Sequence, residues 1–172
     1  MRDHRELSEL GKAVGALLKE RKQTIAVAES SAGGLINAAL VAVPGASAYY
    51  LGGGIIYTKI GREALMGIAR EDVKGMRSAS EPYAQLLAKR VREKLGATWG
   101  LSETGASGPT GNAYGDAPGH ACIAVSGPAS GPASDPHEAV ITVETGSADR
   151  EANMREFARR ALELLAACLQ KS

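Results

Sequence analysis

The sequence predicts an α/β fold with helices on both faces of a sheet. Amphipathic helical patterns alternate along the chain with short apolar runs that are typical of buried strands. Two glycine-rich loops, Ser30 to Gly34 and Gly105 to Gly119, directly follow such runs. Open α/β sheets place their ligand sites at loops of this kind. The 172 residues, 44% of them hydrophobic, are enough for one domain, 1–172, with a substantial core.

The N-terminal part begins with a helical pattern. Apolar residues recur at helical spacing over residues 5 to 21, with charges between them. Thr24 to Glu29 is a short apolar run that predicts a buried strand. Leu35 to Val43 predicts a helix, which Pro44-Gly45 ends. Leu51 to Thr58 predicts a strand, and its glycines indicate that another backbone or a ligand comes close.

The remaining elements follow from turn signals and periodicity. Gly61 to Gly75 favours one or two short helical turns. A helix starts at Ser80, whose hydroxyl is expected to cap it ahead of Glu81 and Pro82, and Gly96 ends it. Ser126 to Ala133, which carries the tetrapeptide SGPA twice, predicts a flexible surface connection. Three strands and a long closing helix complete the pattern, over Trp99 to Thr104, His120 to Val125, Glu138 to Glu144 and Asp149 to Gln170.

Composition excludes several classes of protein. A net charge of +1 gives no electrostatic reason to expect nucleic acid or an anionic membrane as partner. No apolar run approaches the roughly 20 residues of a membrane span, and the N-terminus leads into a charged helix rather than a signal sequence. We therefore expect a cytoplasmic protein. Cys122 and Cys168, in apolar surroundings, are expected to be reduced core thiols. No cluster of His, Cys and acidic residues has metal-ligand spacing, so no structural or catalytic metal is expected.

The first glycine-rich loop, Glu29 to Gly34, would hold a hydroxyl on a tight turn beside backbone N–H groups at a helix N-terminus. Three readings stay open. Ser30 or Ser31 could cap the helix that follows. The turn could bind an anion such as phosphate. A serine could also attack a carbonyl carbon, with nearby N–H groups stabilising the oxyanion.

The second loop, Thr104 to Asn112, has the composition of a backbone that approaches a ligand closely, with a mobile surface connection as the alternative. It matches neither the P-loop nor the dinucleotide fingerprint.

Tyr57 and Lys59 are two residues apart in a predicted strand, so their side chains would point to the same face. Such a pair could relay a proton for a serine, although two chance surface residues would give the same pattern. Asp116 could be a ligand or a turn residue, and a lone His120 is seldom a catalyst.

In this order, these pieces resemble the C-terminal domain of the competence/damage-inducible protein CinA, the nicotinamide-nucleotide amidase family. The similarity runs from about Leu7 to Leu169, and the chain looks like the stand-alone form. Five segments carry it: Thr24 to Leu35 (TIAVAESSAGGL), Val43 to Tyr50 (VPGASAYY), the strand ending at Tyr57, Ser80-Glu81-Pro82, and Thr104 to Pro109 (TGASGP).

The resemblance implies a three-layer α/β/α sandwich with a mixed, mostly parallel sheet. It implies hydrolysis of nicotinamide mononucleotide to nicotinate mononucleotide and ammonia, without a cofactor. The family's nucleophile corresponds to Ser30, its tyrosine to Tyr57 and its lysine, by spacing, to position 62. The two loops are expected to bind the substrate and to hold an oxyanion or a phosphate through backbone N–H groups, with Glu29, Ser31, Gly33, Gly34, Thr104, Gly105, Ala106, Ser107 and Gly108 as the binding residues. A homo-oligomer is also expected.

The sequence departs from the family at position 62. Arg62 stands there, and a guanidinium cannot act as the general base that a lysine can provide. Three readings follow: Lys59 replaces the base, the site acts on another amide-bearing nucleotide, or the chain binds a nucleotide without turnover. Arg62 would suit the last two, since arginine holds phosphate through two hydrogen bonds. A subunit that acts only through its surface is a further alternative.

Overall fold

A five-stranded mixed sheet forms the centre of the computed structural model, which describes residues 2–129 and 136–171. The strand order is β2-β1-β3-β4-β5. Strand β1 runs parallel to β2 and β3, whereas β4 is antiparallel to both of its neighbours. The strands are β1 (Ile25–Glu29), β2 (Tyr50–Ile55), β3 (Trp99–Ala106), β4 (His120–Ala129) and β5 (Pro136–Glu144).

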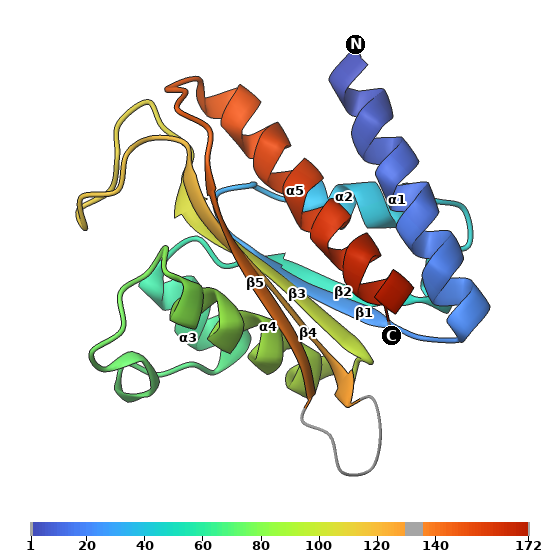
Figure 1. The fold of residues 1–172 in the computed structure, drawn as a ribbon. Coiled ribbons are helices and arrows are strands. Elements are labelled where there is room, and N and C mark those ends of the chain that lie inside the picture. The colour runs from blue at the N-terminus through green and yellow to red at the C-terminus, as the bar shows by residue number, and fades with distance from the viewer. Residues whose placement is uncertain (1, 130–135, 172) are drawn as a thin grey trace.

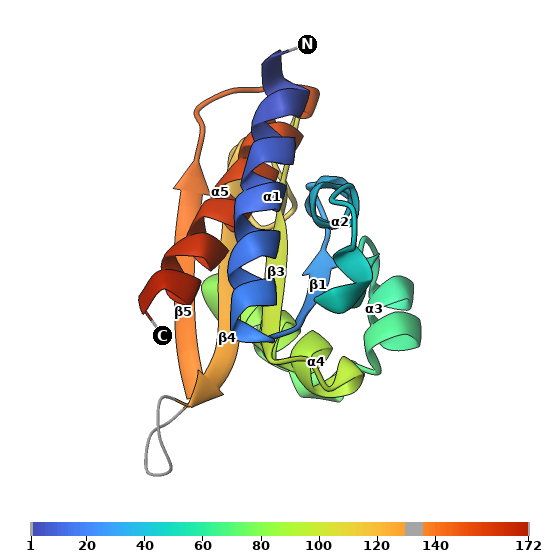
Figure 2. The ribbon, with the colours of Figure 1, turned by 90° about the vertical axis from the view of Figure 1, so that its right-hand side faces the viewer.

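Helices cover both faces of this sheet, which confirms the predicted three-layer α/β/α architecture (Figures 1 and 2). One face carries α1 (Arg2–Arg21), α2 (Leu35–Val41) and α5 (Arg150–Lys171), which pack on one another. The other carries α3 (Lys59–Met66) and α4 (Glu81–Leu95). Short 3-10 turns lie at Ala46–Ala48 and Glu71–Val73. No helix of the described residues is long and apolar enough to cross a bilayer.

Strand β1 is buried on both faces of the sheet. It is buried along its whole length, as its continuous apolar sequence predicts for a central parallel strand. Its two faces pack into different cores, with Val27 in the core under α1, α2 and α5 and Ala28 in the core under α3 and α4. Because β1 and β3 are parallel, the turn after Glu29 and the loop after Ala106 leave the sheet at the same edge.

Strand β2 shows why its glycines are needed. A Cβ atom on Gly53 would lie 2.1 Å from Asn37 Oδ1 and 2.4 Å from the carbonyl oxygen of Val27. Neighbouring backbone therefore does come close, as the glycines indicated.

Strand β2 ends at Ile55, however, and α3 begins at Lys59. The prediction that Tyr57 and Lys59 lie in one strand was wrong, and both are exposed in the segment that follows it.

Two further details differ from the sequence-based expectations. Ser126 to Ala129 lies in β4 rather than in a loop, while the second SGPA copy falls outside the described residues. Ser80 does precede α4 as its N-cap residue, but its hydroxyl makes no cap hydrogen bond. It donates instead to the carbonyl oxygen of Arg77, at 2.7 Å. The helix starts as predicted, without the predicted hydroxyl cap.

Candidate active site

A buried carboxylate holds the turn that follows β1. Glu103 is fully buried, and one of its oxygens, Oε2, accepts hydrogen bonds from the backbone N–H groups of Ser30 (3.1 Å) and Ala32 (2.8 Å). The hydroxyl of Ser31 donates to the other oxygen, Oε1. Burial raises the pKa of Glu103 to about 7, against the effect of these hydrogen bonds. Three consecutive residues are thus fixed to one side chain of the neighbouring strand.

A second buried carboxylate supplies the helix cap that was expected from a serine hydroxyl. Glu29 accepts hydrogen bonds from the backbone N–H groups of Ile36 (3.2 Å) and Asn37 (2.9 Å) at the start of α2, and from the side chain of Asn37. Gly34, the N-cap residue of α2, contributes no side-chain bond. Burial raises the pKa of Glu29 as well. Capping by Ser30 or Ser31 was therefore a wrong reading of this turn, and Glu29 has a structural role.

Ser30, which is partly exposed, lies in the wall of a cavity of about 270 Å³ together with Tyr57 and Lys59. Thr104 and Gly105, from the end of β3, line the same cavity. The tyrosine rings of Tyr83 and Tyr114 complete much of its wall. The structure thus brings the predicted serine, tyrosine and lysine to one cavity, at the edge of the sheet where the two glycine-rich loops meet.

A second cavity, of about 190 Å³, shares Tyr57, Gly105 and Asn112 with the first. Ser31 and residues 106 to 108 of the glycine-rich loop lie in its wall. Arg150, at the start of α5, also lines it. The guanidinium of Arg150 donates to the hydroxyl oxygen of Tyr57 at 2.9 Å and to the carbonyl oxygen of Gly108 at 2.5 Å. A cation and a glycine-rich backbone therefore face the same space.

Other predicted site residues lie outside both cavities. Arg62 is buried, and its Nε atom donates to the carbonyl oxygen of Ile68 at 3.2 Å. The N–H group of Gly33 donates to the carbonyl oxygen of Ser30 at 3.0 Å, so it is engaged within the turn rather than directed at a ligand. Gly34 starts α2. Neither the arginine nor the two glycines line the cavities.

Ala79 lines the first cavity and also contacts a polar cluster. This cluster consists of Arg77, Asn112, Asp116, His120 and Glu144. Ala79 has a φ of +54°, which is unusual for a residue with a side chain. Its N–H group donates to Thr104 Oγ1 at 3.2 Å, and its carbonyl oxygen lies 2.8 Å from His120 Nε2. These two contacts hold the strained residue in place.

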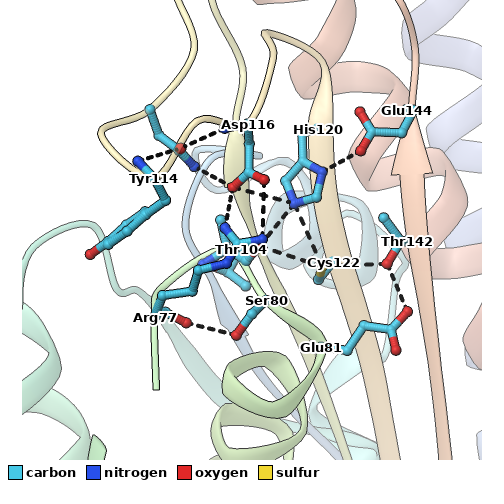
Figure 3. Close-up of polar contacts among 12 residues, drawn as sticks. Arg77, Ser80, Glu81, Thr104, Tyr114, Asp116, His120, Cys122, Thr142 and Glu144 are labelled. Carbon is cyan, nitrogen blue, oxygen red and sulfur yellow. Dashed lines mark hydrogen bonds and ion pairs between the residues drawn. The ribbon is translucent and has the colours of Figure 1, made fainter. Parts of the chain in front are cut away.

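The polar cluster fastens the loop of residues 107–119 (Figure 3). Asp116 pairs with Arg77 through two hydrogen bonds and accepts a third from Asn112 Nδ2 at 2.8 Å. The bond from Arg77 lowers the pKa of Asp116. Asn112 lines both cavities, so the ion pair supports part of their wall.

His120 has a hydrogen-bond acceptor at each of its ring nitrogens, and Figure 3 shows the contact with Glu144. Its Nδ1 contacts the carboxylate of Glu144, its Nε2 faces the Ala79 carbonyl, and Asp116 lies 3.7 Å from Nε2. Burial lowers the pKa of His120, but these contacts outweigh it and the net pKa is raised above 6.5. Because a carboxylate and a carbonyl only accept hydrogen bonds, the ring satisfies both when it carries both protons.

Several residues of this site carry no signal that sequence reasoning could have used. Arg150 is 93 residues from Tyr57, and Glu103 is 73 residues from Ser30. The pair of Arg77 and Asp116 also joins distant segments. Among the described residues no group of three or more His, Cys, Asp or Glu side chains could hold a metal ion.

Comparisons with known proteins identify the family of this chain. The model of the CinA C-terminal domain family matches residues 7–169. A CinA-like protein of Sulfurihydrogenibium sp. is 44% identical over 103 residues, covering 60% of this chain and 26% of that protein. A CinA-like protein of Prochlorococcus marinus is 40% identical over 119 residues, covering 69% of this chain and 28% of that protein. The chain thus spans about a quarter of the length of these relatives.

Solved structures agree on the fold. A CinA superfamily protein from Klebsiella pneumoniae superposes with a TM-score of 0.85 at 22% identity, covering 96% of this chain and 99% of that one. A competence/damage-inducible protein from Agrobacterium tumefaciens gives a TM-score of 0.82 at 23% identity, with 95% of each chain covered. Since the family model covers nearly all of the sequence, this chain belongs to the CinA C-terminal domain family.

Proposed function

We propose that this chain is an amidohydrolase that converts nicotinamide mononucleotide to nicotinate mononucleotide and ammonia, with Ser30 as nucleophile. One observation carries the proposal: Ser30, Tyr57 and Lys59 line one cavity, and a glycine-rich backbone with Arg150 lines the adjoining one. Membership of the CinA family supports it.

The two cavities suit the two ends of this substrate. The first has three tyrosine rings in its wall, and aromatic faces attract a flat cationic ring such as a pyridinium. The second has the guanidinium of Arg150, whose planar fork matches a phosphate group. A mononucleotide carries its ring and its phosphate at opposite ends, so it would extend from one cavity into the other. In this arrangement Arg150, rather than Arg62, binds the phosphate.

The chemistry follows the usual course of acyl transfer. The Ser30 oxygen attacks the carboxamide carbon while its proton passes to Tyr57 or Lys59. Because Arg150 donates to the Tyr57 oxygen, that bond does not use the phenol proton, which stays available for the relay. Residues 106 to 108 line the second cavity, where their backbone N–H groups would bind the phosphate beside Arg150. The relayed proton leaves with ammonia, and water then hydrolyses the Ser30 ester.

The test is ammonia release from nicotinamide mononucleotide, with product identified by a mass increase of one unit. Ser30→Ala should lower kcat at least about a thousandfold while substrate binding persists. Arg150→Ala should raise KM. Arg155→Ala, on the same helix but outside both cavities, is the matched control and should leave both constants unchanged. No ammonia from the wild-type protein would refute the proposal.

Nucleotide binding without turnover is the second candidate, and the environment of Arg62 favours it. This residue occupies the family's lysine position but is buried against Ile68, so it provides no base. Calorimetry would then show saturable binding of the mononucleotide without ammonia release. A surviving affinity in Arg150→Ala would count against both candidates, because both need that cation.

A further inference from the structure

Glu103 is an ionisable group beside the proposed nucleophile to which the mechanism above gives no role. It receives hydrogen bonds from two backbone N–H groups and one hydroxyl of the turn Ser30–Ala32. Its strand β3 pairs with β1 up to Ala28 and Ser102, so the carboxylate stands where β1 ends and the turn begins. Among the residues that the structure describes, Glu103 is the side chain that contacts all three residues of this turn.

The surroundings of Glu103 contain little that would compensate a charge. Glu29, at the end of β1, further disfavours the ionisation of Glu103 because it is a second carboxyl group. The residue paired with Glu103 on β4 is Ile123. The buried side chains described on α1, α2 and α5, the helices on this face, are uncharged at neutral pH: Leu7, Val14 and Leu18 on α1, Ile36, Ala39 and Leu40 on α2, and Asn153, Phe157, Ala158, Ala161, Leu162, Leu165, Cys168 and Leu169 on α5. Glu103 therefore exchanges its proton near neutral pH.

The two protonation states hold the turn differently. When Glu103 is ionised, all three groups donate to a carboxylate, and such charge-assisted hydrogen bonds are about twice as strong as neutral ones. When it is protonated, Oε2 still accepts from the two backbone N–H groups, but the proton on Oε1 faces Ser31 and reverses that hydrogen bond. The contacts persist in both states, and only the ionised state has the stronger set.

We propose that Glu103 is a positioning residue for Ser30, and that the loss of its proton tightens the turn Ser30–Ala32 and raises turnover. This inference rests on the proposed function. It gives the site a pH dependence that comes from a group outside the proton relay.

Glu103→Gln is the decisive variant, because glutamine reproduces the neutral state: its oxygen can accept from the two N–H groups and its amide can donate to Ser31. In the wild-type protein kcat should rise roughly threefold to tenfold through an inflection near pH 7, with KM unchanged. In the variant kcat should stay at the acid level throughout. Glu138→Gln, which removes an exposed carboxylate of β5, should keep the wild-type profile. An inflection that survives in Glu103→Gln but disappears in His120→Asn would overturn the proposal.

Backbone amides provide a readout that needs no activity. The NMR signals of the Ser30 and Ala32 amides should titrate with a midpoint near 7 in the wild-type protein and not in Glu103→Gln. If no ammonia is released, the proposed function fails, while these amides still decide whether Glu103 controls the turn. Amides that do not titrate would overturn the inference. So would loss of turnover in Ser31→Ala with turnover retained in Ser30→Ala, because Glu103 would then be a base for Ser31.

Discussion

Two segments at the same edge of the sheet, the turn Ser30–Ala32 and the loop 107–119, are fastened in contrasting ways. A single, fully buried carboxylate holds the turn, and no salt bridge to it is found among the described residues. Charged partners hold the loop through Asp116, which pairs with the exposed Arg77 and lies 3.7 Å from His120. Both segments contribute to the walls of the cavities. The same edge thus combines a site where charge is disfavoured with one where it is favoured.

The raised pKa values of Glu103 and His120 have opposite physical causes. The pKa of Glu103 is raised because burial penalises its charged form. Burial lowers the pKa of His120, but its hydrogen-bond acceptors stabilise the charged form, and the net pKa is raised. Neutral replacements of similar shape should therefore change the stability of the folded protein in opposite directions. Replacing Glu103 removes a penalty that appears at high pH, and replacing His120 removes a stabilisation that is present at low pH.

The largest effect is expected for the stability of Glu103→Gln as a function of pH. The folded pKa of Glu103, about 7, lies above the usual 4.5, so its contribution is complete below pH 4.5 and is lost as pH rises through 7. Glutamine does not ionise and escapes this loss. Relative to the wild-type protein, the variant should gain on the order of 3 kcal/mol between pH 4.5 and 8. Urea denaturation at several pH values measures it, and a difference independent of pH would contradict it.

This loss of stability is compatible with the higher turnover expected of the ionised state. The penalty arises from moving a carboxylate out of water on folding, whereas the stronger hydrogen bonds act locally on the turn and offset only part of it. Activity that is gained at the expense of stability is a common feature of enzyme sites. The two properties should therefore change in opposite directions across the same pH range.

His120→Asn should give a smaller effect of the opposite sign. Because the folded pKa of His120 lies above 6.5, the stabilisation is complete below that pH and disappears as pH rises through the raised value. The variant should be less stable than the wild-type protein at pH 5.5, with the difference shrinking by pH 9. The same denaturation series measures both variants. A variant that became relatively more stable as pH fell would show that the two sites do not differ as described.

Sequence reasoning was most successful where one segment contains the whole signal. Helices and buried strands followed from periodicity, and the turn Ser30 to Gly34 followed from glycines between a strand and a helix. Strand β2 was extended too far, because an apolar run continues to Tyr57 while pairing with β1 stops at Ile55. Capping by a serine hydroxyl was wrong because Glu29, the residue before Ser30, accepts the hydrogen bonds from the first N–H groups of α2.

Contacts between distant segments could not be predicted in this way. Arg62 was selected by its spacing in the motif, but the fold directs it to Ile68, and Arg150 lies at the cavity instead. The sequence around Arg62 and around Arg150 does not show which of the two arginines is buried and which lines a cavity. The importance of Glu103 likewise depends on the pairing of β1 with β3, which places its carboxylate beside a turn 73 residues away. The expected cytoplasmic location and homo-oligomer stay predictions.

Asp116→Asn should produce the smallest effect of the three variants and should act on substrate binding. The change removes the charge that Arg77 pairs with, yet an amide oxygen can still accept one hydrogen bond, so the loop 107–119 should loosen rather than unfold. Asn112, which bonds to Asp116, lines both cavities. We therefore expect KM for nicotinamide mononucleotide to rise about threefold with kcat nearly constant, since exposed ion pairs contribute little. A fall in kcat without a change in KM would mean that this loop acts on the reacting groups, as the turn Ser30–Ala32 does, and the contrast between the two segments would not hold.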